Sequence, residues 1–286
     1  QYALLGQSYS FQNYNVEDGV SHPFIYDMVQ DSKGFMWIAT GEGLCRFNGL
    51  NFKNYYIEDG LSENFISTLH KANNGDIWMG HKQGGCSIIR DGKVETVNTS
   101  EYLSSVIRAI NQDEQGNTWI LSQHSGVIKI DPENQLHHFE KPFSQLLLFD
   151  LEVNSRGQML VGTNEGLYLY LLDEDSSEPV FEKIIGEIPM TKINTISAGQ
   201  LPGQYYIGTE DEGLFKLQIR SNNRAVVEPV ASELELYRYD IQTVLETDRN
   251  NLWVGTFGSG LFNLAPGPNN GAHQLVSHFD ETNGLG

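Results

Sequence analysis

The sequence predicts an all-β chain folded as a β-propeller of four-stranded antiparallel blades. The first observation is a phrase that recurs as "DSKGFMWIATGEGL", "NNGDIWMGHKQGG", "DEQGNTWILSQHSG" and "DRNNLWVGTFGSGL". The second is its period, because Trp37 and Trp78 are 78 − 37 = 41 positions apart and Trp119 follows 41 positions later. The third is that no stretch shows apolar residues at helical spacing over three turns. Short strands repeating every ~40–50 residues are typical of propeller blades.

Six copies of this phrase fill most of the 286 residues. Leu160 in "SRGQMLVGTNEGLYLY" stands 160 − 119 = 41 positions after the third tryptophan. Tyr206 follows after 46 positions and Trp253 after a further 47. We therefore expect six complete blades in a single propeller domain covering residues 1–286.

The first repeat, taken in order, contains four runs typical of strands. The run "FIYDMVQ" is followed by the turn "DSKG", then by "FMWIAT", "GEG", "LCRFNG" and "LNFKNYY". Gly, Asn and Asp separate the runs, as expected of tight turns between strands. A stacked solenoid would need end caps, whereas a closed propeller protects its strand edges. We expect the first strand of each repeat to line the central channel.

The two ends of the chain indicate an incomplete seventh repeat. The segment "SHFDETNGLG" is similar to the linker that elsewhere precedes a new unit, and "YSFQNYN" reads as an outer strand without inner strands before it. The intact protein is therefore expected to be seven-bladed, the rival prediction being a six-bladed closure. With six blades we expect either a tightened ring, with "YSFQNYN" near "LVSHFD", or a homodimer formed through the gap, because open apolar faces drive association.

The tryptophan position of the repeat is predicted to be structural core. A large ring in the middle of a strand can fill the space between adjacent blades, and burying it contributes about 2–3 kcal/mol. Leu160 and Tyr206 occupy the same position in two repeats, which suits packing rather than chemistry. The predicted core tryptophans are Trp37, Trp78, Trp119 and Trp253.

Composition excludes some classes of function. There are 18 basic and 37 acidic residues, so the net charge of −19 disfavours nucleic acid as a partner. Cys45 and Cys86 occupy one repeat position in neighbouring blades, which should lie beyond the ~7 Å reach of a disulfide. We expect both thiols to be free and buried. No apolar run approaches the ~20 residues of a membrane-spanning helix.

The repeat resembles a known family. The pattern "D-x-x-G-x-x-W-x-G-T-x-x-G-L", followed by an "F-x-x-Y" strand and the turn "E-D-G-L-S-x-N", is similar to the two-component regulator propeller repeat. The segments "FKNYYIEDGLSENFISTL" and "FQNYNVEDGVSHPFIYDM" carry this resemblance most closely. They resemble the N-terminal periplasmic sensor propeller of hybrid two-component system histidine kinases of Bacteroidetes. The fourth and fifth repeats depart from the pattern because they lack the tryptophan.

The resemblance implies a function for the chain. In that family, propellers precede a β-sandwich, a transmembrane helix, and kinase and regulator domains, and the sensor responds to glycan-derived oligosaccharides. The resemblance therefore implies a periplasmic ligand-sensing domain that relays a signal to further domains of the same parent chain. It also implies an oligosaccharide partner and no enzymatic activity in this chain itself.

The ligand-binding residues should lie on one face of the propeller. Loops that enter each first strand and loops that join the second and third strands gather around the channel, and they vary while the strands repeat. Aromatic rings beside amides and charges suit a sugar. The predicted ligand-binding residues are His22, Asn64, His81, Lys82, Tyr102, His124, Tyr237, Arg238, Tyr239 and Phe257.

Two other functions are kept as alternatives. A propeller enzyme, either a polysaccharide lyase or a glycoside hydrolase, would use paired carboxylates or histidines such as His22, His81 and His124. These histidines lack a local metal-binding spacing such as H-x-x-x-H. The other alternative is a WD40-like platform for protein interactions. We expect no catalytic residues, no metal and no cofactor.

Overall fold

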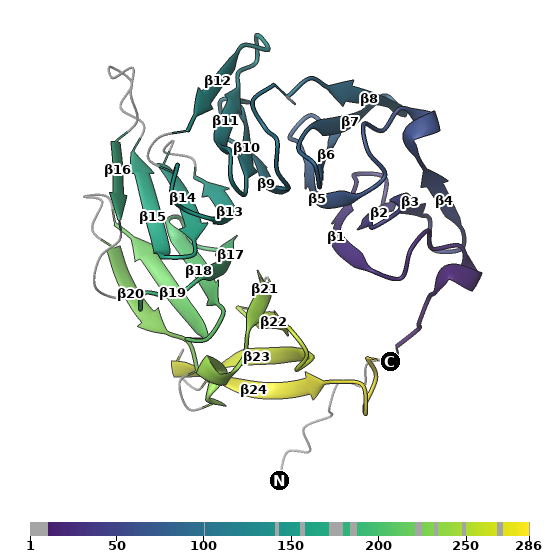
Figure 1. The fold of residues 1–286 in the computed structure, drawn as a ribbon. Coiled ribbons are helices and arrows are strands. Elements are labelled where there is room, and N and C mark those ends of the chain that lie inside the picture. The colour runs from purple at the N-terminus through teal and green to yellow at the C-terminus, as the bar shows by residue number, and fades with distance from the viewer. Residues whose placement is uncertain are drawn as a thin grey trace.

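A computed structural model shows six four-stranded antiparallel sheets arranged around a central axis (Figure 1). The structure describes residues 11–99, 101–140, 143–154, 158–171, 180–183, 188–220, 225–231, 234–247, 250–267 and 271–285. The predicted β-propeller of four-stranded blades is confirmed. In every blade the strands follow one another in chain order, with the first strand innermost.

Blades one to three contain strands of four to six residues. Blade one comprises β1 (Ile25–Gln30), β2 (Met36–Thr40), β3 (Gly43–Phe47) and β4 (Phe52–Tyr55). Blade two comprises β5 (Ile66–Lys71), β6 (Ile77–His81), β7 (Cys86–Arg90) and β8 (Lys93–Val97). Blade three comprises β9 (Ile107–Gln112), β10 (Thr118–Ser122), β11 (Gly126–Ile130) and β12 (Leu136–Phe139).

Blades four to six repeat this plan, with a longer last strand in blade six. Blade four comprises β13 (Leu148–Val153), β14 (Gln158–Thr163), β15 (Gly166–Leu171) and β16 (Val180–Lys183). Blade five comprises β17 (Ile193–Ala198), β18 (Gln204–Thr209), β19 (Leu214–Ile219) and β20 (Ala225–Pro229). Blade six comprises β21 (Ile241–Glu246), β22 (Leu252–Thr256), β23 (Leu261–Gly267) and β24 (Gly271–Phe279).

The recurring "D-x-x-G-x-x-W" phrase forms the hairpin between the first two strands of a blade. In blade three the Asp113 carboxylate accepts the Asn117 backbone N–H at 2.8 Å and the indole N–H of Trp119 at 2.8 Å. Asp31 accepts the indole N–H of Trp37 at 2.9 Å in the same way. The aspartate therefore closes the turn and also satisfies the polar atom of a buried ring, which would otherwise be costly.

The acidic "E-D-G" linkers fold into single turns of 3-10 helix. Two of them, η1 (Val16–Asp18) and η2 (Ile57–Asp59), precede blades one and two, and each is followed by a left-handed glycine with φ near 110°. Another short helix, η4 (Leu236–Arg238), has a different sequence and precedes blade six. In η2 the Asp59 side chain accepts the backbone N–H of Tyr56 at 2.9 Å, so the acidic residue fixes the turn.

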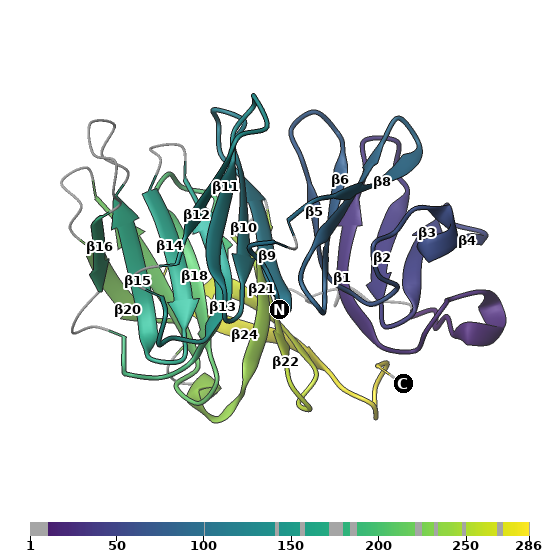
Figure 2. The same cartoon turned by 45° about the horizontal axis from the view of Figure 1, so that its top comes forward.

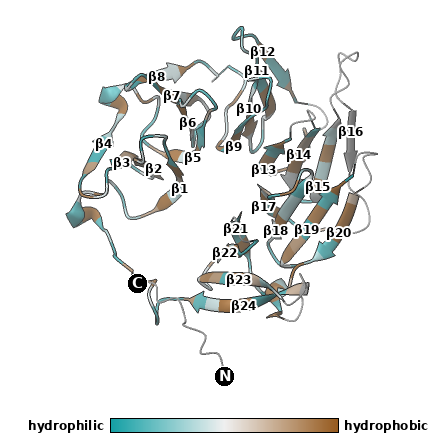
Figure 3. Cartoon of the chain, turned by 180° about the vertical axis from the view of Figure 1, so that it is seen from behind, coloured by the Kyte–Doolittle hydropathy of each residue, from teal (hydrophilic) through white to brown (hydrophobic). Residues whose placement is uncertain are grey.

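Five apolar clusters fill the five interfaces between consecutive blades. Between blades two and three, Trp78 of β6 packs in one cluster with Ile107 and Ile110 of β9. The same repeat positions meet at the other interfaces. Figure 3 shows apolar segments along the packed strands, and Figure 2 shows the blades standing side by side. Core formation therefore occurs between blades rather than within one blade.

Blades one and six leave their outward faces uncovered. The first residue of the inner strand is fully buried in the five later blades, whereas Ile25 of β1 is 43% exposed. Met28 of β1 is 56% exposed, and Leu245 of β21 is exposed on the other side of the same gap. The described ends of the chain lie in this gap, where the ring of Phe11 packs edge-on against Phe279 with centroids 5.0 Å apart.

The expectation for the N-terminal segment "YSFQNYN" is only partly met. Tyr9 and Ser10 lie outside the described residues. Phe11 approaches β24 as expected, but residues 11–15 do not form a strand. Both cysteines are free and buried, as predicted.

Candidate functional site

Each inner strand begins with a bulge at its second residue. The register skips from the first to the third residue in all six inner strands, for example between Ile25 and Asp27 of β1. A bulge leaves the extra residue out of the ladder and re-aims its side chain. The six skipped residues, which we call the inner ring, are Tyr26, Ser67, Arg108, Phe149, Asn194 and Gln242.

The inner ring is the variable position of a strand that otherwise repeats. The residue immediately before it is isoleucine in five of the blades and leucine (Leu148) in blade four. The inner ring itself contains six different side chains, including two aromatic rings, one guanidinium and two amides. A fixed scaffold that presents a variable set of side chains around one axis is typical of a recognition surface.

Contacts connect the inner ring from blade to blade. The Tyr26 ring lies 4.6 Å from that of Phe65, the residue before β5. The Ser67 hydroxyl donates to the carbonyl oxygen of Ile107 at 2.6 Å. The Arg108 guanidinium lies 5.7 Å from the centre of the Phe149 ring. Each of these side chains is therefore positioned by the next blade.

The contacts continue through blades four to six. The Lys192 ammonium lies 4.8 Å from the centre of the Phe149 ring, so this ring contacts two cations. The Asn194 amide donates to the Asp240 carboxylate at 2.6 Å and to the Ile241 carbonyl at 3.1 Å. Gln242 donates to the same carboxylate at 2.6 Å. Asp240 therefore fixes two amides of the inner ring.

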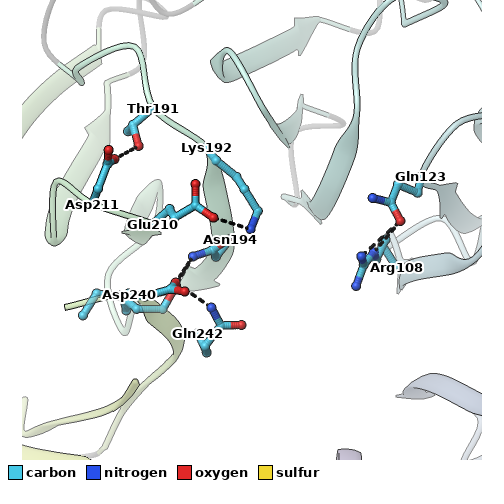
Figure 4. A network of polar contacts seen from close by, with 10 residues as sticks. Arg108, Gln123, Thr191, Lys192, Asn194, Glu210, Asp211, Asp240 and Gln242 are labelled. Atoms are coloured by element: carbon cyan, nitrogen blue, oxygen red, sulfur yellow. Dashed lines mark hydrogen bonds and ion pairs between the residues drawn. The ribbon is translucent and has the colours of Figure 1, made fainter. Parts of the chain in front are cut away.

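A second variable position surrounds the inner ring. It is the residue that directly follows the second strand of each blade, and together these residues form what we call the second ring: Gly41, Lys82, Gln123, Asn164, Glu210 and Phe257. The Gln123 side chain accepts two N–H bonds from Arg108, and Glu210 pairs with Lys192 at 3.0 Å. Figure 4 shows both groups: Arg108 lies with Gln123 on one side, and the other side holds Lys192, Glu210, Asn194, Asp240 and Gln242.

The two rings and the residues beside them offer two kinds of contact. In blades two to four, cations lie against aromatic rings, since Lys82 lies 4.8 Å from the Phe65 ring and Arg108 faces Phe149. In blades five and six, the carboxylates of Glu210 and Asp240 contact a cation and two amides. Aromatic faces can stack on the C–H face of a sugar, while amides and carboxylates can bind its hydroxyls.

Three carboxyl groups lie deeper along the inner strands. Asp27 accepts the backbone N–H of Leu69 at 2.7 Å, and Asp150 accepts that of Ile196 at 2.6 Å, so each joins two blades. Burial raises the pKa of Asp27 and raises that of Asp150 to about 7. Burial, helped by the charge of Asp150, raises the pKa of Glu152 to about 8. These groups hold blades together rather than facing solvent.

The predicted placement of His81 on the loop surface is wrong. His81 is the last residue of β6 and is fully buried, and its ring nitrogens contact the Ser87 hydroxyl at 2.8 Å and the Phe65 carbonyl at 3.1 Å. Burial lowers its pKa to about 4. It occupies the position held by Thr40 in β2, where the smaller hydroxyl donates to the Gly43 carbonyl of the turn. The sequence alone did not distinguish the end of this strand from the loop that follows it.

Two other predicted residues have structural partners. The Asn64 side chain accepts the backbone N–H of Ile57 at 2.9 Å, so the Asn of the linker motif holds η2 in place. The His22 ring accepts the backbone N–H of Phe24 at 3.1 Å. Both side chains use an acceptor atom within their own loop.

The remaining predicted residues are at the surface but are not all close to the inner ring. Lys82 and Phe257 belong to the second ring, and exposed His124 follows it directly. Tyr102 lies against His138 of the outer strand β12 instead. The loop before blade six presents exposed Tyr237 and Arg238 and half-buried Tyr239, which packs against Phe262.

The tryptophan position is buried in blades one to five. Trp37, Trp78 and Trp119 are buried, as are Leu160 and Tyr206 at the same position. Trp253 is half-buried and stacks on Phe279 beside the gap.

Sequence reasoning did not identify the inner ring. It treated the inner strands as scaffold and sought recognition residues only in loops. The available signal was the difference in variability between positions of the inner strand. The first and fourth positions are aliphatic in all repeats apart from Met28, whereas the second position changes from repeat to repeat. The bulge that brings this position out of the ladder became apparent only from strand register.

Within the described residues, no cluster of three or more His, Cys, Asp or Glu side chains has the arrangement of a metal site. A search of the same residues also found no helix with the length and apolar character needed to cross a membrane.

Comparison with known proteins finds one family repeat and a shared propeller fold. Residues 19–42 match the model of the two component regulator propeller family. No curated protein matches the sequence. The fold is similar to that of the extracellular domain of a putative hybrid two component system from B. thetaiotaomicron, with 19% identity and a TM-score of 0.51. That match covers 90% of this chain and 41% of the other.

Other solved propellers have the same fold. PorZ, a surface component of the type-IX secretion system of Porphyromonas gingivalis, matches with 17% identity and a TM-score of 0.72 over 93% of this chain and 43% of that one. Virginiamycin B lyase from Staphylococcus aureus matches with 11% identity and a TM-score of 0.70 over 88% and 83%. This chain thus spans about two fifths of the sensor domain and of PorZ. It carries a two-component regulator propeller repeat on the fold used by the extracellular domains of hybrid two-component systems.

Proposed function

We propose that this chain is an extracytoplasmic ligand-sensing propeller of a hybrid two-component sensor histidine kinase. In this proposal it lies in the periplasm, binds a glycan-derived oligosaccharide at the inner and second rings, and passes the signal to other domains of its parent chain. The repeat match at residues 19–42 and the shared fold with sensor domains support the receptor class.

The observation that carries the ligand proposal is the inner ring. Phe149 is half-buried with cations on two sides, and in the next two blades Asn194 and Gln242 are fixed by one carboxylate. An aromatic face beside ordered amides matches the two kinds of surface that a sugar ring presents. Because these side chains are held by neighbouring blades, little conformational entropy is lost on binding.

Calorimetric titration of the chain against a panel of plant, host and microbial oligosaccharides would test this proposal. We expect at least one glycan to bind, and Phe149→Ala to weaken it about tenfold or more, since one stacking contact is removed. Phe52→Ala is the matched control, because Phe52 is a half-buried phenylalanine on the outer strand β4 and is not part of either ring. Binding of no glycan, or equal losses from both variants, would contradict the proposal.

A further inference from the structure

Arg108 is an exposed cation whose orientation is fixed by Gln123, while three of its N–H donors have no partner among the described residues. Its Nε and Nη2 atoms both donate to the single Oε1 of Gln123, at 3.2 and 3.0 Å. A guanidinium has five N–H donors, so three remain, and they include the outer fork formed by its two terminal nitrogens. That fork matches the two oxygens of a carboxylate.

No counter-ion among the described residues neutralises this group. The ion pairs of the described chain engage Arg90, His137, Lys192 and Arg238, and neither Arg108 nor Lys82 is among them. Burial lowers the pKa of Arg108, as expected of a cation that is desolvated without a paired charge. Most lysines and arginines of the described chain also lack a carboxylate partner, but these two belong to the rings, so this surface can accept an anionic group.

The surrounding groups limit what kind of anion can bind. Phe149 lies beside Arg108 and Phe65 beside Lys82, so both cations border an aromatic surface. Glu210 and Asp240 lie in the loops of blades five and six, where they would repel a polyanion but accept hydroxyl donors. The arrangement fits a molecule with an anionic group at one end and hydroxyl groups at the other.

We propose that the two rings bind an acidic oligosaccharide, with the carboxylate of a uronic acid residue held by the outer fork of Arg108 and by Lys82. This inference rests on the proposed function and specifies its ligand class. Phe149 stacks on the sugar ring, and Asn194, Asp240 and Gln242 bind hydroxyl groups on the far side. Gln123 acts as the residue that positions the guanidinium.

Titration of the chain with three saccharide probes tests the assignment. The probes are a galactose trimer with one terminal galacturonic acid residue, the neutral galactose trimer of the same linkage, and the same trimer with one sulfate ester on its terminal residue. We expect the uronate to bind at least about tenfold more tightly than the neutral trimer, because one charge-assisted bidentate contact is added. Preference for the sulfated trimer would assign the site to sulfate esters and overturn the carboxylate.

Variants of one side chain separate charge from geometry. Arg108→Gln should abolish the preference for the uronate, and Arg108→Lys should retain only part of it, since lysine keeps the charge but lacks the fork. Lys93→Gln, on the outer strand β8, removes an equal charge away from the rings and should change nothing. Gln123→Ala should weaken binding of the uronate more than binding of the neutral trimer, because it releases the guanidinium from its fixed orientation.

The results distinguish this inference from the proposed function. If neutral glycans bind as tightly as the uronate and Arg108→Gln has no effect, the acidic ligand is wrong while glycan sensing stands. If no saccharide of any charge binds, both proposals fall. Circular dichroism of each variant confirms that the propeller remains folded in these comparisons.

Discussion

The interface between blades two and three and the open side between blades six and one are built from the same repeat positions but differ in packing. Ile110 of β9 and Met28 of β1 hold the same position on their inner strands, and they are 6% and 56% exposed. Trp78 is buried against the next blade, whereas Trp253 is half-buried and stacks on Phe279 near the chain end. A repeat residue therefore becomes core only where a neighbouring blade covers it.

The tryptophan position should show the largest effect. Trp119→Ala removes a fully buried ring whose indole N–H bonds Asp113, so we expect a loss of about 3–5 kcal/mol in the free energy of unfolding. Trp253→Ala, at the half-buried position beside the gap, should cost about 1–2 kcal/mol. Denaturant titration followed by far-UV circular dichroism measures both. Equal losses would show that the sixth interface is closed in solution.

The aliphatic inner-strand position gives the next largest contrast. Ile110→Ala should destabilise the chain by about 2–4 kcal/mol, because it leaves a cavity between two blades. Met28→Ala should cost less than about 0.5 kcal/mol, as is usual for exposed positions. Thermal unfolding of both variants under identical buffer conditions provides the comparison, and a large loss from Met28→Ala would mean that another surface covers β1.

Buried carboxyls give the closed interfaces between blades a stability that depends on pH. Burial raises the pKa of Glu152 from 4.5 to about 8, so the folded state holds this proton more tightly than the unfolded chain. The free energy of unfolding should therefore fall as pH rises from about 4.5 to about 8, and then level off.

Replacing that carboxyl tests the effect. Glu152→Gln keeps an oxygen that can accept the Asn111 amide now bonded at 2.9 Å, and it should raise stability at pH 8 by about 1–2 kcal/mol with little change at pH 4. Denaturant titrations at both pH values measure the difference. Glu281→Gln, on the exposed chain end, is the control and should leave the free energy of unfolding unchanged at both pH values.

The smallest effect on stability, but a direct test of association, is expected at the open faces. The homodimer expected from the sequence stays a prediction. In that dimer, the apolar faces that carry Met28 and Leu245 would form the contact between the two copies. Met28→Lys combined with Leu245→Lys should change the unfolding free energy by less than about 0.5 kcal/mol yet convert any dimer to monomer. Sedimentation velocity measures the mass. If the unsubstituted chain is already a monomer, the dimer prediction is wrong.

The sequence by itself determined the fold class, the blade number and the interblade role of the tryptophan position. A period of 41 residues, with Asp, Gly and Trp at fixed offsets, leaves few alternatives once helical spacing is absent. The aspartate turn and the tryptophan are local in the chain, so their hydrogen bond follows from a separation of six residues. The linker motif was recognisable for the same reason.

Only the tertiary structure decided which repeated residues are covered and which are presented to a ligand. His81 and Lys82 are adjacent in sequence, yet the first is a buried strand end and the second is exposed beside Phe65. Arg108 meets Phe149, 41 positions away, because a bulge turns its side chain out of the ladder towards the next blade. Such contacts depend on register and on the presence of a neighbouring blade, and a pattern within one repeat carries neither.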